Sequence, residues 1–264
     1  MQNAEQLNER REYKYLLPPE KVKRVRHIAN TIGKRDGYAG PDGLYTIRSL
    51  YFDTDRYHLF TANVREAGDR YKVRVRNYPN TGSTGPIFLE VKQRVGDIIR
   101  KTRGMVKPSQ WTTLLTHPSS FYTMDLGLKY RTAVERFVTL VQTYHLQPTM
   151  LVEYDREAYF SEIDEYARLT FDLRIRCQQR DSLDLRASAQ DWRHVDNPIR
   201  TRTQEPMTLL ELKFGGPPPR WMTRMVQNLE LERHTFSKYG YSVIEQLNLP
   251  EARTSRLMLE DWGS

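Results

Sequence analysis

The sequence contains 264 residues, with 41 Lys and Arg against 33 Asp and Glu, so the formal net charge is +8. A hydrophobic fraction of 38% is enough for a folded core and excludes a disordered chain. No stretch approaches the roughly 18 consecutive apolar residues of a membrane helix, and a single cysteine, Cys177, excludes a disulfide scaffold. We therefore expect a soluble, cytoplasmic protein whose positive charge favours anionic partners.

The predicted elements alternate between strands and helices along the chain. Alternation of apolar and charged residues predicts strands, and apolar spacing of three and four residues predicts helices. In chain order these are a strand at 11–17, a helix from Pro18-Pro19 to about Gly33, strands at 45–52, 70–77, 87–94 and 100–106, a helix at 126–144, strands at 151–159, 168–173 and 208–214, and helices after Pro217-Pro218-Pro219 and at 235–247. Residues 77–86 are typical of a hairpin loop, and the polar stretch 187–206 predicts a surface excursion. Because no repeat or linker interrupts this series, the simplest organisation is one α+β domain over 1–264.

Several predicted strands carry cations at alternate positions. In the strand at 70–77, one face presents Arg70, Lys72, Arg74 and Arg76. Such neighbours lie roughly 7 Å apart and repel by about 2 kcal/mol at an effective dielectric near 20. A solvated sheet face explains any one strand, but six strands of this kind together favour a bound polyanion. Removing one such cation is then expected to leave the melting temperature unchanged or raised.

An antiparallel sheet with these faces can close into a β-barrel that encloses a polar lumen, with helices over its apolar exterior. Glu12, Glu90 and Glu211 each precede a lysine by two residues on the same face. These carboxylates fit beside phosphate where a hard cation bridges them, and the alternative is an intrastrand salt bridge. P-loop, dinucleotide and zincin motifs are absent, and the six histidines lack ligand spacing.

The order of motifs resembles the VTC domain, the catalytic module of vacuolar transporter chaperone-type polyphosphate polymerases in the CYTH-like triphosphate tunnel metalloenzyme superfamily. The resemblance spans about residues 11–242. Its motifs include R-E-Y-K-Y at 11–15, K-V-R-V-R at 72–76, F-L-E-V-K at 88–92, L-E-L-K at 210–213 and F-S-K-Y at 236–239.

The resemblance implies a closed antiparallel tunnel of about eight strands with a cation-lined lumen. In that family ATP and Mn²⁺ or Mg²⁺ bind in the tunnel, and the γ-phosphate passes to a growing polyphosphate chain. Carried over by position, the catalytic residues are Lys14, Arg74, Arg76, Arg156 and Lys238. Further substrate contacts come from Lys92, Lys101, Tyr154, Arg168 and Ser237, and strand position adds Arg48 and Arg103. Glu211 is the expected metal ligand, with Glu12 and Glu90 as further metal-side candidates.

Two rival functions stay open at this point. A metal-dependent inorganic or nucleoside triphosphatase of the same fold differs only in that water attacks. A noncatalytic polyphosphate- or nucleic-acid-binding protein would need no metal. Arg10 stands where the superfamily's E-x-E-x-K signature has its first Glu, which suits the VTC branch. We expect ATP and inorganic polyphosphate as partners, no nucleic acid and no transmembrane segment in this chain; a membrane partner stays open.

Overall fold

The computed structural model describes residues 10–82, 84–96, 98–164, 166–196, 198 and 206–249. Its strands are β1 (Arg10–Leu17), β2 (Gly33–Arg35), β3 (Tyr45–Asp53), β4 (Asp69–Asn77), β5 (Ile87–Val95), β6 (Ile98–Val106), β7 (Gln147–Ser161), β8 (Ala167–Gln179), β9 (Arg193–His194) and β10 (Thr208–Gly215). Its α-helices are α1 (Pro19–Ile32), α2 (His58–Val64), α3 (Trp111–Thr116), α4 (Leu128–Thr143), α6 (Arg220–Asn228) and α7 (Lys238–Gln246). No helix in these ranges is both long and apolar enough to cross a membrane.

The predicted strands and helices are confirmed, most of them to within three residues, but β7 begins four residues before its predicted start and β8 ends six residues beyond its predicted end. The short elements α2, α3, β2 and β9 were not expected. Part of the predicted excursion at 187–206 lies outside the described residues, and β9 forms within the rest of it.

The ten strands form one sheet in the order β1-β10-β8-β7-β3-β4-β5-β6, with β2 beside β7 and β9 beside β8. A barrel requires its two outer strands to pair. Within the described ranges β1 and β6 end this order without pairing, so the sheet is open. The other edge of β1, which does not pair with β6, contacts the segment before α7. There the His234 N–H donates to the Lys14 carbonyl at 2.8 Å, and Tyr15 forms an isolated bridge with Arg233. The α+β class is thus confirmed, whereas the closed eight-stranded barrel is not.

The chain divides into two compact units. Unit 1 comprises the described residues within 1–46, 154–175 and 194–236, and unit 2 those within 47–153, 176–193 and 237–264. Strands β7 and β8 therefore contribute residues to both units.

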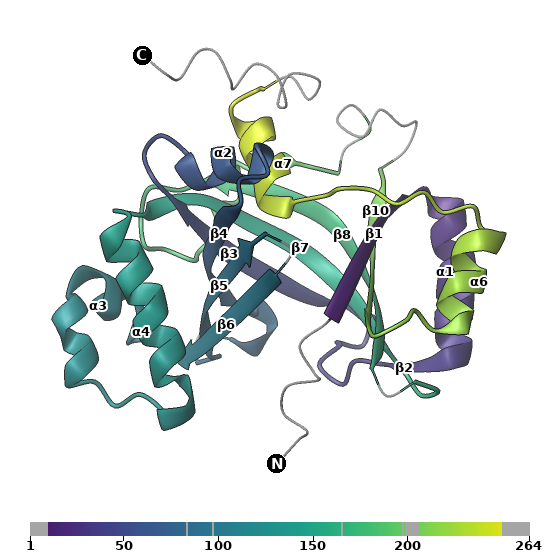
Figure 1. The fold of residues 1–264 in the computed structure, drawn as a ribbon, viewed down its shortest axis with the longest axis horizontal. Coiled ribbons are helices and arrows are strands. Elements are labelled where there is room, and N and C mark those ends of the chain that lie inside the picture. Colours follow the sequence, from purple (N-terminus) through teal and green to yellow (C-terminus); the bar gives the residue numbers. More distant parts are fainter. Residues whose placement is uncertain are drawn as a thin grey trace. The chain divides into compact units, whose positions relative to one another are not determined.

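Unit 1 packs its strands on α1 and α6 (Figure 1), whose buried residues belong to one hydrophobic core. Alternation in β10 sends Leu210, Leu212 and Phe214 into this core, where they meet Val25 of α1 and Met222 of α6. The residues of β10 that alternate with these three include its charged residues, and they lie on the opposite face of the strand.

Unit 2 packs one face of β3–β6 on α3 and α4, which flank these strands in Figure 1. Val73, Val75 and Leu89 point into this core, where Phe137 of α4 is also fully buried. Helices α2 and α7 lie together in the same unit. The face of β4 and β5 opposite the core carries the charged side chains.

Candidate functional site

In unit 1 the charged face is organised around Glu211 of β10, whose residue is only 4% exposed. Its Oε2 accepts hydrogen bonds from Arg156 Nη2 at 3.1 Å and Lys213 Nζ at 2.7 Å. Lys14 Nζ lies 3.8 Å from the other carboxylate oxygen. The carboxylate therefore lies among three cations from β1, β7 and β10.

Arg156 forms the strongest pair on this face. It donates two hydrogen bonds, at 2.6 and 2.7 Å, to the carboxylate of Asp172, which is fully buried. Burial lowers the pKa of Arg156, but the negative charge of Asp172, with Tyr154 and Glu211, raises it well above its ordinary value. The guanidinium also lies 5.4 Å from the ring centroid of Tyr154. Arg156 is thus held as a permanent cation in a fixed position.

Lys14 joins Glu12 to the same face. Its Nζ lies 3.3 Å from Glu12 Oε1 and donates to the carbonyl of Phe236 at 2.8 Å. Arg168, by contrast, is exposed, and its guanidinium stacks 3.9 Å from the ring centroid of Phe160. The structure thus brings Lys14, Glu12, Arg156 and Glu211 together, and Arg168 lies on the same face of β8, opposite Lys213 in register.

A second charged cluster surrounds Glu90 in unit 2. In register, Arg74, Glu90 and Arg103 lie across β4, β5 and β6. Glu90 pairs with Arg74 at 2.6 Å, Arg103 at 3.2 Å and Arg76 at 3.6 Å. Burial raises the pKa of Glu90, but the three guanidiniums outweigh it and lower the pKa to about 2. Three arginines thus converge on one carboxylate.

Beside this cluster a row of lysines crosses the same three strands. Lys72, Lys92 and Lys101 stand opposite one another in register. Lys72 Nζ donates to Ser237 Oγ at 2.9 Å, and the same oxygen accepts the Gly240 N–H at 3.1 Å as the N-cap of α7. The following residue, Lys238, is buried, with 8% of its surface exposed.

Arg48 does not share this face. Its register partner in β4 is Asn77, so Arg48 lies on the core side of β3, whereas Ser49 and Tyr51, opposite Arg76 and Arg74, lie on the charged side. Its guanidinium pairs with Glu153 at 2.6 Å and donates to the Leu185 carbonyl at 2.9 Å.

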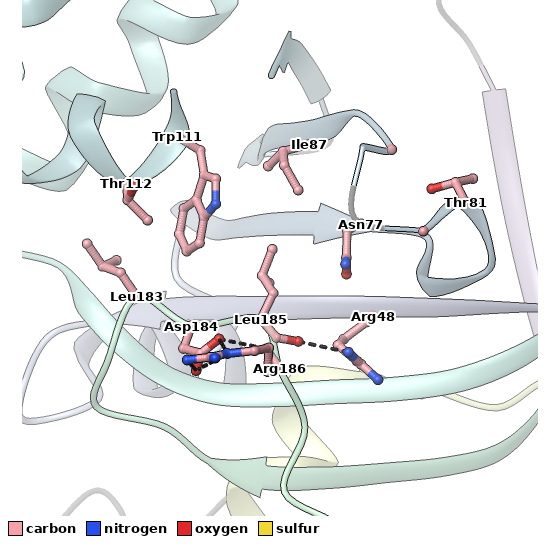
Figure 2. A pocket seen from close by; sticks show the side chains of 12 residues that line it. Arg48, Asn77, Thr81, Ile87, Trp111, Thr112, Leu183, Asp184, Leu185 and Arg186 are labelled. Atoms are coloured by element: carbon pink, nitrogen blue, oxygen red, sulfur yellow. Dashed lines mark hydrogen bonds and ion pairs between the residues drawn. The ribbon is translucent and has the colours of Figure 1, made fainter. Parts of the chain in front are cut away.

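The guanidinium of Arg48 borders a cavity of about 290 Å³ in unit 2. Figure 2 shows Trp111, Ile87 and Leu185 as its apolar lining, with Arg48 linked to the Leu185 carbonyl. The strand-position argument for Arg48 overlooked the alternation of β3. Arg103, added on the same argument, does lie in the Glu90 cluster.

Whether these faces could bind a divalent cation depends on the donor groups that they present. No group of three or more His, Cys, Asp or Glu in the described part of the chain could hold a metal by itself. Glu211 and Glu12 both reach Lys14, however, and the buried hydroxyl of Thr170, opposite Glu211 in register, has no hydrogen-bond partner within the described residues. One or two carboxylates with substrate phosphates are the usual magnesium donors, so unit 1 fits a substrate-borne cation. Glu90 belongs to unit 2 and is not part of this donor set.

Sequence reasoning missed three partners on these faces. Asp172 and Lys213 stand on the charged sides of predicted strands, where they could have been included with their neighbours. The cross-strand pairing that aims Asp172 at Arg156 has no signal in the sequence. The hydrogen bond from Arg74 Nη1 to the Tyr51 hydroxyl, at 2.9 Å, likewise depends on strand register.

Comparison with known proteins places the chain in a family. The VTC domain matches residues 9–245. No curated protein matches. Among solved structures, the PH1819 protein from Pyrococcus horikoshii OT3 is 10% identical, with a TM-score of 0.44 over 91% of this chain and 99% of that one. Because the match covers most of the sequence, the chain belongs to the VTC domain family, which is associated with polyphosphate-metabolising enzymes.

Proposed function

We propose that this protein is a metal-dependent polyphosphate polymerase that transfers the γ-phosphate of ATP to a growing inorganic polyphosphate chain. Family membership supports a polyphosphate-related function. The observation that carries the proposal is the convergence of cations from β4, β5 and β6 on one face, where three arginines meet Glu90 and the lysine row lies alongside. Such a face attracts a polyanion by charge.

The proposed roles follow from charge and position. In unit 1 we propose Lys14 and Arg156, and in unit 2 Arg74, Arg76 and Lys238, as the cations that neutralise phosphate charge. Further phosphate contacts by charge or hydrogen bonds are proposed for Arg168 and Tyr154 in unit 1 and for Arg103, Lys92, Lys101 and Ser237 in unit 2. Arg48 takes no part in this proposal, because it lies on the core side of β3.

The proposed reaction needs no protein nucleophile. A terminal oxygen of the polyphosphate chain attacks the γ-phosphorus of ATP in line, the bond from that phosphorus to the β–γ bridging oxygen breaks, and ADP leaves with the electron pair. The arginines stabilise charge on the equatorial oxygens. The only thiol is unsuited to attack, since burial raises the pKa of Cys177 to about 12.

Glu211 and Glu12 are the residues we propose to hold a Mn²⁺ or Mg²⁺ ion that arrives with the substrate. Such a cation would supply further neutralisation of phosphate charge. Lys14 and Lys213 pair with these carboxylates and orient them on the charged face of unit 1. We assign Glu90 a pairing role instead.

The decisive test is incubation of the purified protein with ATP and Mn²⁺, with products separated on a gel. We expect a polyphosphate ladder from the native protein and a loss of at least 100-fold in Arg74→Gln. Arg186→Gln is the matched control, because that exposed arginine pairs only with nearby Asp184 and should retain full activity. Free phosphate without a ladder would identify a triphosphatase. Polyphosphate binding that persists in EDTA, with no product, would indicate a noncatalytic binder.

A further inference from the structure

Unit 2 contains a buried pair, Asp53 and Tyr239, that no proposed catalytic role uses. Asp53 is fully buried at the end of β3 and accepts backbone N–H bonds from Thr54, Leu59 and Phe60, each at 2.8 Å. Its fourth donor is the hydroxyl of Tyr239 in α7, at 2.6 Å. This carboxylate therefore fastens the first turn of α2 and α7 to the end of β3.

The ring of Tyr239 is held as firmly as its hydroxyl. It stacks on Tyr51 with 4.8 Å between centroids and an interplanar angle of 18°, and it meets Phe60 edge-on at 6.4 Å. Burial, followed by the charge of Asp53, raises the pKa of Tyr239 well above its ordinary value, so the hydroxyl stays a donor. Tyr239 is 3% exposed, which leaves it little freedom to move.

Two proposed phosphate-binding cations depend on this ring. Lys238 precedes Tyr239 in α7 and is itself buried, so the anchor fixes the backbone from which its side chain extends. On the other side, Tyr51 accepts a hydrogen bond from Arg74 at 2.9 Å, with the guanidinium 5.7 Å from its ring centroid. A displacement of Tyr239 would therefore reach both cations.

We propose that Tyr239, held by Asp53, is a positioning residue that fixes Lys238 and, through Tyr51, Arg74 for phosphoryl transfer. This inference rests on the proposed function. Positioning matters because displacement of a charged group by about 1 Å can cost about 100-fold in rate.

The test uses Tyr239→Phe in the full chain, which keeps the ring and removes only the hydroxyl. We expect kcat to fall at least tenfold with KM nearly unchanged. We also expect trace acetic anhydride to label Lys238 at least threefold faster, as read by mass spectrometry without substrate. Ser242→Ala is the control in the same helix, since its buried hydroxyl has no partner within the described residues; both readouts should stay at native values.

The two readouts separate this inference from the proposed function. Suppose that the wild-type protein makes no polyphosphate but that Tyr239→Phe still speeds the labelling of Lys238. That result would support the positioning role of Tyr239 and refute the proposed polymerase activity. Unchanged labelling of Lys238, whatever happens to kcat or to the melting temperature, would overturn the inference. If Tyr239→Phe does not fold, Tyr51→Phe serves instead, with kcat expected to fall while Lys238 labelling stays native. An unchanged kcat in that variant would refute the link to Arg74.

Discussion

Glu90 is the residue on which the charge balance of unit 2 depends. Its pKa is lowered from 4.5 to about 2, so the ionised form is favoured in the folded state. A depressed pKa contributes stability that is present above pH 4.5 and lost as the pH falls towards 2. At about 1.4 kcal/mol per pKa unit, the contribution near neutral pH is about 3 kcal/mol.

We therefore predict that Glu90→Gln lowers the free energy of unfolding by about 3 kcal/mol at pH 7, measured by urea denaturation. At pH 3 the gap between variant and native protein should shrink to less than half. The control is Glu20→Gln, whose side chain is 80% exposed and pairs only with Lys23 among the interactions described. An equal gap at both pH values would mean that ion pairing is not what Glu90 contributes.

Arg156 reverses an expectation drawn from the sequence. Cations at alternate strand positions suggested that removing one would relieve repulsion. The structure shows instead that Arg156 neutralises Asp172 and Glu211, both buried. Removing one partner of a buried pair leaves uncompensated charge, which costs about 3–5 kcal/mol.

For Arg156→Ala we predict a loss of unfolding free energy of about 3 kcal/mol or more, together with loss of turnover. Arg174→Ala, in the adjacent strand β8, is the control: its side chain is 59% exposed and pairs with Asp155, so its loss should cost less than about 1 kcal/mol. A thermal or urea melt of both variants decides the matter. If Arg156→Ala unfolds at the same temperature and urea concentration as the native protein, the expectation of relieved repulsion would be supported instead.

At the scale of elements, the packing of α4 on the sheet depends on a glycine. A Cβ built on Gly104 of β6 would lie 2.6 Å from Val134 Cγ2 and 3.0 Å from the Val134 backbone nitrogen. The helix can approach this strand only because the side chain is missing. That approach in turn fixes the strand that carries Lys101 and Arg103.

Gly104→Ala should therefore destabilise the protein by about 1–3 kcal/mol through overpacking. Gly68→Ala provides the comparison, because a Cβ there meets nothing within 4 Å. Differential scanning calorimetry should show a lower melting temperature for the first variant alone. Equal melting temperatures would show that α4 shifts at little cost.

The elements themselves were largely predictable from local sequence. Alternation in 70–77 and 87–94 found β4 and β5 because every second residue enters one core. Helix α2 was missed, since its seven residues are too short for a periodic stripe and its first turn is capped from outside by Asp53. Strand register could not be predicted from the sequence either. The pairing of Arg156 with Asp172 and the position of Arg48 depend on that register, so they could not be predicted. The predicted closure of the sheet into a barrel was wrong, because no local sequence pattern indicates which segment lies along the second edge of β1.

At the scale of the whole molecule, the net charge of +8 should govern encounter with a polyanion. We predict that the affinity for tripolyphosphate, measured by titration calorimetry, falls at least tenfold between 50 and 500 mM NaCl, because salt screens exposed charges. Lys92→Gln should lessen that salt dependence. Lys129→Gln in α4, away from the charged face, should leave it unchanged. A salt-independent affinity would argue against electrostatic capture.

Strands β7 and β8 each contribute to both units, and each unit is assembled from three separate stretches of sequence. No single cut in the polypeptide can therefore release either half intact. Gene truncations meant to isolate one charged face would remove strands from its partner as well. The same constraint acts in evolution, because neither half can be exchanged or lost without removing strands from the other.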